Sequence, residues 1–176
     1  MTRIRHRDET DLSMCVNALR SVYQAGGYPV NWPADPAQWL RTPETLRAWV
    51  AETDDLPVAG HVVLRQSPGA ARSAEVSRLF VVPAARRKGV AFALLAAAMR
   101  AAAENDLDLF LDVTDDLRAA RALYERAGFR LVSTAIADWT TPDGHSVTLH
   151  RYAWSRGLHD QRGDPSTQSG RVRSNP

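Results

Sequence analysis

The chain has 176 residues, a length that suits one domain with a sizeable core. Hydrophobic residues make up 44% and charged residues 24%, as in ordinary soluble globular proteins. The sequence contains no long uncharged apolar run, so a membrane is not an expected partner. The net charge of +2 arises in residues 156–176, where four arginines face two aspartates, so the rest of the chain is neutral. Because nucleic-acid-binding domains usually have a basic body, we do not expect nucleic acid as a partner.

The ends of the chain and its single cysteine indicate where in the cell the protein is expected and which part of it is expected to be folded. The first residues, MTRIRHRDETD, lack the apolar core of a signal peptide, so a cytoplasmic protein is expected. The single cysteine, Cys15, cannot form an internal disulfide, which fits a reducing compartment. Residues 156–176 are rich in Gly, Ser, Arg and Pro and are predicted to form a disordered tail after a folded domain at residues 1–155.

The first half of the chain predicts strands and short helices in alternation. Apolar residues at helical spacing follow the possible caps Asp8, Thr10 and Asp11, and two glycines and three prolines in residues 25–36 interrupt the pattern. The expected elements are a strand at 2–7, a helix at 12–24, a short helix and turn at 37–46, and a hairpin of strands at 47–53 and 59–66.

The second half predicts strand, helix, strand, helix and two closing strands. These elements are expected at 74–82, 89–106, 107–114, 115–129, 130–141 and 146–155. Pro83 should end the first strand, Asp115 or Asp116 should cap the second helix, and Gly128 should stop it. A strand–helix–strand unit favours a parallel pair with a right-handed crossover, and the flanking hairpins add antiparallel strands. The fold class is therefore a mixed α/β sheet in one domain.

The turn Arg86-Arg87-Lys88-Gly89 opens the predicted helix at 89–106. A helix N-terminus presents unpaired N–H groups and partial positive charge, and glycine lets an anion approach the backbone. Such a turn suits a phosphate or pyrophosphate, although basic surface turns before helices are common. It matches neither the Walker pattern nor G-x-G-x-x-G, and no His/Cys/Asp spacing suggests a metal site.

The wider stretch LFVVPAARRKGVAFALL resembles the cofactor motif of the GNAT superfamily of acyl-CoA-dependent N-acetyltransferases. That motif is an apolar strand ending near a proline, followed by Arg/Gln-x-x-Gly-x-Gly/Ala, which stands here as Arg86-Arg87-Lys88-Gly89-Val90-Ala91. ALYERAGFRLV is similar to the family's last helix and following strand. The resemblance is specific from Glu75 to Val132 and implies a mostly antiparallel sheet with a parallel, splayed strand pair and flanking helices.

The resemblance implies acetyl-CoA as acyl donor. Its pantetheine arm would pair with the strand before the turn, and Arg86 would contribute electrostatically. The residues implied for the pantetheine are Leu79, Phe80 and Val81. The backbone amides implied for the pyrophosphate are those of Arg87, Lys88, Gly89, Val90, Ala91 and Phe92.

The resemblance also implies candidate catalytic groups. Tyr124 is the expected general acid for the leaving thiolate, with a core aromatic as the alternative, and an N–H near Val81 is expected to hold the developing oxyanion. Glu75 and Asp112 are candidate bases, each equally readable as a solvated or salt-bridged strand carboxylate, and Glu52 has weaker support. The family often has an asparagine seven residues before the tyrosine, where this chain has Leu117, so that contact is in doubt.

The acceptor region is expected in residues 22–40 and in the closing hairpin. Tyr28, Trp32 and Trp139, with Tyr23 and Trp39, are candidate walls of a small, partly apolar pocket or else residues that cover the core. The expected reaction is acetyl transfer from acetyl-CoA to a primary amine of a small molecule, amino acid or peptide. A non-catalytic acyl-CoA sensor and a protein N-terminal acetyltransferase are the alternatives. The closing strands offer an edge that could form a homodimer.

Overall fold

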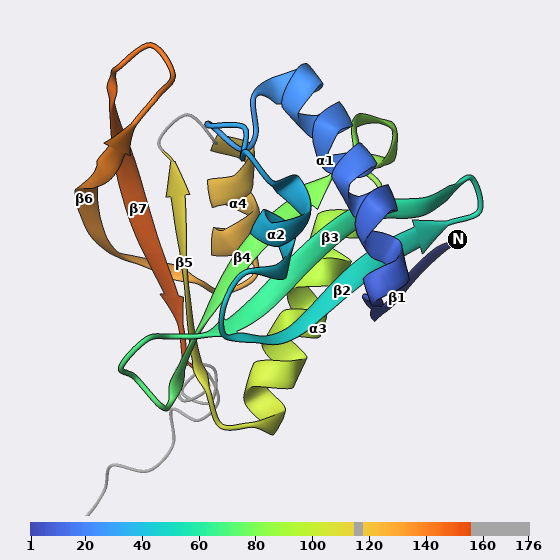
Figure 1. Ribbon diagram of the computed structural model, residues 1–176. Coiled ribbons are helices and arrows are strands. Elements are labelled where there is room, and N and C mark those ends of the chain that lie inside the picture. The colour runs from blue at the N-terminus through green and yellow to red at the C-terminus, as the bar shows by residue number, and fades with distance from the viewer. Residues whose placement is uncertain (115–117, 156–176) are drawn as a thin grey trace, which may run out of the picture.

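The computed structural model describes residues 1–114 and 118–155, which form a seven-stranded sheet in the order β1-β2-β3-β4-β5-β7-β6. All neighbouring strands are antiparallel except β4 and β5, which run parallel. The predicted mixed sheet is thus confirmed (Figure 1). The strands are β1 (Thr2–His6), β2 (Thr45–Thr53), β3 (Leu56–Gln66), β4 (Ser73–Val81), β5 (Asp108–Thr114), β6 (Arg130–Thr140) and β7 (Ser146–Trp154).

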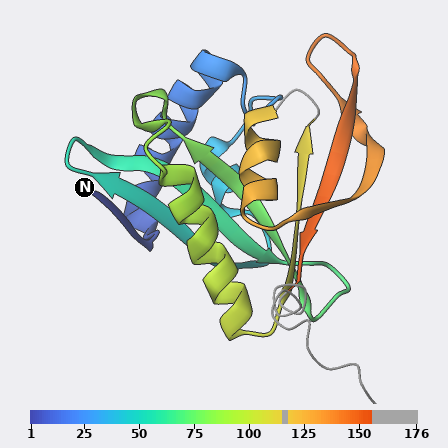
Figure 2. The same ribbon diagram turned by 180° about the vertical axis from the view of Figure 1, so that it is seen from behind.

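The described residues form four α-helices, which cover the two faces of this sheet. In Figure 1, α1 (Leu12–Gly26) and α2 (Pro36–Arg41) lie in front of it, and α3 (Val90–Glu104) and α4 (Arg118–Arg126) lie behind it, as Figure 2 shows from the other side. Short 3₁₀ turns, η1 (Glu9–Asp11) and η2 (Pro83–Ala85), precede α1 and follow β4. The predicted caps Asp115 and Asp116, Leu117 and the predicted tail at 156–176 lie outside the described residues.

Local sequence explains how the helices begin and end. The backbone N–H of Asp8 donates to Asp11 Oδ2 at 2.8 Å before α1, and the Gln38 N–H donates to the Asp35 side chain at 2.9 Å at the start of α2. After α4, Gly128 adopts a left-handed conformation (φ 93°), as its predicted stop role requires. The buried residues of α1 are Leu12, Cys15, Ala18, Leu19 and Val22, whereas Val16 and Tyr23 are half-buried.

The core is densest where α3 crosses β3 and β4. Val58 to Leu64 in β3 are buried on both faces of the sheet, and Leu94, Leu95 and Ala98 of α3 pack against them. At Gly60, an added Cβ would lie 2.8 Å from Phe80 O and 2.9 Å from Leu94 Cδ1, so α3 approaches the sheet too closely there for a side chain. This close packing fixes the N-terminal end of α3 beside the end of β4.

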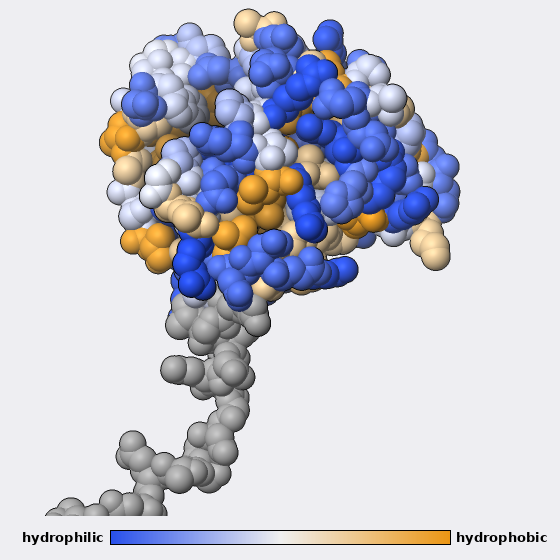
Figure 3. Space-filling model, turned by 60° about the horizontal axis from the view of Figure 1, so that its bottom comes forward, coloured by the Kyte–Doolittle hydropathy of each residue, from blue (hydrophilic) through white to orange (hydrophobic). Residues whose placement is uncertain are grey.

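The β6 edge differs from the rest of the surface. Every residue of β6 is exposed or half-exposed, and its apolar side chains include Val132 and Ile136, which are 58% and 66% exposed. The face drawn in Figure 3 is mostly hydrophilic, with a few separate apolar patches. Within residues 1–114 and 118–155, no helix combines the length and hydropathy needed to cross a membrane. Pairing of two copies through the β6 edge stays a prediction.

Candidate active site

The parallel strands β4 and β5 separate after a short paired stretch. Their pairing runs from Ser73 to Glu75 on β4 and ends there. Beyond it, two steps of β3, from His61 to Val63, face three steps of β4, so β4 carries a bulge, and Arg78 adopts a left-handed conformation (φ 54°) within it. Beyond the bulge the backbones of β4 and β5 diverge, as Figure 1 shows, and we call the space between the two diverging strands the gap.

The backbone of Val81 faces this gap. The N–H of Val82 donates to Ala59 O of β3 at 3.0 Å. Because neighbouring residues of an antiparallel strand alternate between the partner strand and the opposite side, the N–H of Val81 points away from β3 and toward the side that β5 has left. The carbonyl of Val81 accepts from Arg86 Nε at 3.4 Å. An N–H aimed into the gap can stabilise negative charge that develops there.

The turn after β4 presents a row of unpaired N–H groups. Gly89 caps α3 in a left-handed conformation (φ 78°), and the first N–H of the helix with a backbone acceptor is that of Ala93, which donates to Gly89 O at 3.0 Å. The six consecutive N–H groups from Arg87 to Phe92 have no acceptor in the part of the chain that the structure describes. Arg86, Arg87 and Lys88 are exposed beside them. Donors, helix dipole and cations together fit a pyrophosphate.

Tyr124 lies on α4 with its ring in the core. The residue is 8% exposed, and its ring packs near those of Phe129 and Tyr152 at centroid distances of 6.1 Å and 6.3 Å. Its hydroxyl has no hydrogen-bond partner among the described residues, but the hydroxyl oxygen is not fully buried. Burial raises the pKa of Tyr124, and the nearby Tyr28 raises it further. The phenol therefore keeps its proton at neutral pH.

Each of the two predicted bases forms an ion pair with an arginine. Arg65 donates to Glu75 Oε2 from Nε at 2.9 Å and from Nη2 at 2.5 Å, which leaves Oε1 without a partner among the residues described. Arg151 instead holds both oxygens of Asp112, at 2.8 Å and 2.7 Å. Glu75 lies where the strands begin to part, whereas Glu52 pairs with Arg5 at the β1–β2 edge, far from the gap.

The candidate acceptor walls gather around α2 and the segment before it. The ring of Tyr28 meets that of Trp39 edge-on at 6.2 Å, and that of Tyr23 lies 5.1 Å from Trp32. Burial raises the pKa of Tyr28 to about 12. Trp139 is 36% exposed on β6. The Asn31 side chain donates to Thr140 O at 2.9 Å, which joins this segment to the end of β6.

His61 and Arg7 support the bulge, and no sequence signal singled them out. His61 is fully buried and stacks on Phe80, with Nδ1 3.0 Å from the Arg78 carbonyl oxygen and Nε2 3.0 Å from Arg7 Nη1. Because a carbonyl only accepts and a guanidinium only donates, Nδ1 must carry the proton and Nε2 must accept. Arg7 also donates to Leu40 O at 2.8 Å, so one cation joins the segment after β1 to α2 and to His61, which bonds the bulge.

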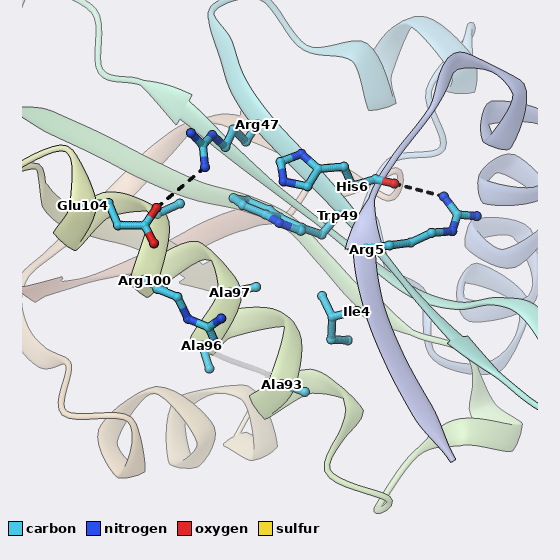
Figure 4. A pocket seen from close by; sticks show the side chains of 11 residues that line it. Ile4, Arg5, His6, Arg47, Trp49, Ala93, Ala96, Ala97, Arg100 and Glu104 are labelled. Carbon is cyan, nitrogen blue, oxygen red and sulfur yellow. Dashed lines mark hydrogen bonds and ion pairs between the residues drawn. The ribbon is translucent and has the colours of Figure 1, made fainter.

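A separate hollow lies on the α3 side of the sheet. Figure 4 shows it between α3 and the β1–β2 edge, with Trp49 and Ile4 on one wall and the small side chains of Ala93, Ala96 and Ala97 on the other. The sequence-predicted donor-binding, catalytic and acceptor residues line no part of it. We therefore take the place where β4 and β5 diverge, rather than this hollow, as the candidate active site.

The family profile described as Acetyltransferase (GNAT) family matches residues 13–129, about two thirds of the chain. The chain belongs to the GNAT acetyltransferase family. These enzymes are acetyl-CoA-dependent N-acetyltransferases, so membership confirms the resemblance seen in the sequence and gives acetyl-CoA as the acyl donor. No curated protein sequence matches the chain.

Solved structures of this GNAT protein's fold include several N-acetyltransferases. The ribosomal-protein-S18-alanine N-acetyltransferase from Escherichia coli has a TM-score of 0.70 at 20% identity, covering 87% of this chain and 92% of its own. A GCN5-related N-acetyltransferase from Kribbella flavida has a TM-score of 0.68 at 25% identity, covering 88% and 97%. NAA60 from Arabidopsis thaliana, in complex with acetyl-CoA, has a TM-score of 0.73 at 16% identity, covering 89% and 99%.

We expect His61 to make the stability of this GNAT domain depend on pH. Burial lowers the pKa of His61 to about 3, whereas the same imidazole should have a pKa of about 6.5 in the unfolded chain. Between these values the unfolded state takes up a proton that the folded state does not, so stability is complete above about pH 6.5 and falls as pH is lowered, by up to about 1.4 kcal/mol per pH unit.

Urea unfolding from pH 6.5 to 4.5, where carboxylates remain mostly ionised, measures this dependence. The slope should be shallower in His61→Gln than in the wild type. His145→Gln, which alters an imidazole exposed on the β6–β7 turn, should keep the wild-type slope. Equal slopes in the wild type and His61→Gln would show that His61 is not held neutral.

Proposed function

We propose that the protein transfers an acetyl group from acetyl-CoA to the primary amine of a small molecule by direct attack, in the gap between β4 and β5. One observation carries the proposal. The bulge in β4 turns the N–H of Val81 toward the place where β4 and β5 diverge, and the unpaired N–H groups of Arg87 to Phe92 follow directly in the turn that opens α3. A thioester whose pyrophosphate lies on this turn would bring its carbonyl beside the Val81 N–H, where an amine can attack it.

The chain's own groups fit the donor. Acetyl-CoA supplies a thioester whose carbonyl carbon is electrophilic and whose thiolate can leave. The N–H groups of Arg87 to Phe92 would hold the pyrophosphate, and the edge of β4 at Leu79, Phe80 and Val81 would pair with the pantetheine arm. The hydroxyls of Ser77 and Thr114, one on each diverging strand, are buried without a partner in the described part, so each could hydrogen-bond to a bound ligand that reaches it.

Each catalytic role then falls to a group with a suitable environment. The N–H of Val81 faces the gap and can hold negative charge on the acyl oxygen. Tyr124 keeps a proton on its phenol oxygen for the leaving sulfur, because burial raises its pKa. Glu75 is the favoured base, since Oε1 remains unpaired while both oxygens of Asp112 are bonded to Arg151. The Glu75 carboxylate can accept the amine's proton directly or through water.

The contact between Asn31 and Thr140 favours a small acceptor. It joins residues 109 apart in the sequence and links the segment before α2 to β6, on the face where an acceptor would enter. Tyr28, Trp32 and Trp139 would form partly apolar walls there. A long polypeptide would need to displace this contact, whereas an amino acid or small amine would not. This observation ranks a protein N-terminus below a small molecule.

Gly89→Glu should weaken acetyl-CoA binding by about 100-fold or more. The substitution places a negative charge and a side chain at a left-handed residue where the pyrophosphate is proposed to lie. Isothermal titration calorimetry with acetyl-CoA measures the effect. Gly69→Glu is the matched control, because Gly69 is also left-handed (φ 74°) with open space around it, but lies in the β3–β4 connection. Equal loss in both variants, or in neither, would contradict the assigned site.

Tyr124→Phe should lower kcat by about 100-fold, because the leaving thiolate loses its proton donor. Thiol release from acetyl-CoA in the presence of a panel of primary amines measures the rate. Tyr152→Phe is the control, since that hydroxyl donates to Glu125 at 3.0 Å, so its loss should affect stability rather than kcat. Wild-type protein that binds acetyl-CoA but releases no thiol with any amine would instead indicate a sensing module.

Glu75→Gln should lower kcat/KM for the amine by roughly 10- to 100-fold, and Asp112→Asn by much less. The reason is the unpaired Oε1 of Glu75, set against the bidentate pair of Asp112 with Arg151. Steady-state kinetics over pH 6 to 9 separate the two, because loss of the base should steepen the dependence on the fraction of neutral amine. The reverse order would move the role to Asp112, and two small effects would indicate that water receives the proton.

A further inference from the structure

Resting on the proposed function, we propose that the acetyl acceptor carries a carboxylate close to its primary amine, as a free amino acid does, and that Arg78 binds this carboxylate. The inference starts from the bulge in β4. It concerns which amines the site accepts, not how the acetyl donor is held.

The backbone at Arg78 directs its side chain to the acceptor face. Arg78 is left-handed (φ 54°), a conformation that costs a non-glycine residue roughly 1 kcal/mol, and backbone strain of this kind is often found at ligand sites. Its guanidinium lies over the ring of Trp39 in α2, with Cζ 3.9 Å from the ring centroid, and Nε lies 3.3 Å from the Trp39 carbonyl oxygen. The side chain therefore lies on the α1–α2 side of β4.

The charges on this face leave Arg78 without a carboxylate partner. Arg65 is paired with Glu75, and Arg151 is paired with Asp112. Arg78 forms no ion pair within residues 1–114 and 118–155, so no carboxylate of the described chain offsets its charge. An acceptor that brings one negative charge would neutralise it.

The donors of Arg78 are also mostly unused. Within the described residues, only Nε of its guanidinium makes a hydrogen bond. The two Nη atoms make none there, and neither is fully buried. The Nη groups are thus open to the solvent side of the face. Stacking on Trp39 fixes the plane of the guanidinium, which prepares it for the two parallel N–H bonds that a carboxylate accepts.

Arg78 is close to the proposed reaction centre. It lies on β4 between Glu75 and Val81. The Trp39 ring under its guanidinium also meets the ring of Tyr28 at a centroid distance of 6.2 Å, so Trp39 connects the cation to a proposed wall of the acceptor site. Burial lowers the pKa of Arg78 because its charge is partly removed from water, and a bound anion would offset that cost.

These positions define the class of acceptor. An amine at Glu75 and Tyr124 with a carboxylate at Arg78 must carry both groups within a few bonds, as amino acids do. An amino-acid amide lacks the negative charge, as does a peptide at the same position. A simple amine lacks the group altogether. The site should therefore distinguish a free amino acid from its carboxamide.

The test has two parts. The first compares L-amino acids with their carboxamides by kcat/KM for thiol release. The second measures, by calorimetry, how the N-acetyl derivatives of both sets bind to the protein loaded with CoA. The wild type should prefer the best carboxylate acceptor over its amide by at least about tenfold. Arg78→Gln should remove this preference by weakening the carboxylate arm while leaving acetyl-CoA binding unchanged. Arg78→Lys should keep part of it, because a point charge replaces the bidentate fork.

Arg20→Gln is the matched control, because Arg20 also lies over a tryptophan, 5.7 Å from the ring centroid of Trp32, but on α1 rather than β4. It should leave the preference unchanged. Carboxylates and amides used equally by the wild type, a preference that survives Arg78→Gln, or no binding of any carboxylate derivative would each overturn the inference. Carboxylate binding that depends on Arg78 without turnover would uphold it and reject the proposed catalysis.

Discussion

The extra residue in β4 is the feature on which the rest of the site depends. Without it, β4 and β5 would continue the parallel pairing that starts at Ser73, and the sheet would be closed. The bulge strains the backbone, because Arg78 is left-handed. The buried imidazole of His61 stabilises it by a hydrogen bond to the Arg78 carbonyl oxygen. His61 is itself bonded to Arg7, so a cation from the segment that follows β1 also supports the bulge.

The regular elements could be predicted from the sequence because each carries a local signal. Pro83 ends β4, Gly89 opens α3 and Gly128 stops α4, as their backbone chemistry requires. The turn before α3 could be predicted for the same reason, since helix, glycine and cations are adjacent in the chain. The bulge could not, because an arginine, rather than glycine, occupies the left-handed position in β4.

The polar contacts of the site could not be predicted from the sequence either. Asp112 and Arg151 are 39 residues apart, and Asn31 and Thr140 are 109 apart, so their pairing depends on strand register and on how the segment before α2 packs. The same holds for the choice between the two carboxylates. Sequence alone left Glu75 and Asp112 equivalent, whereas the number of carboxylate oxygens bonded to arginine separates them, one in Glu75 and both in Asp112.

The row of N–H groups from Arg87 to Phe92 has a consequence for the energetics of donor binding. These groups have no acceptor in the described part of the chain, so a phosphate can bind to them without breaking any bond within the protein. The loop is therefore preorganised, and association carries little reorganisation cost there. Affinity for the donor is then governed by how well its phosphate oxygens fit these N–H groups, and this can change without altering the stability of the sheet.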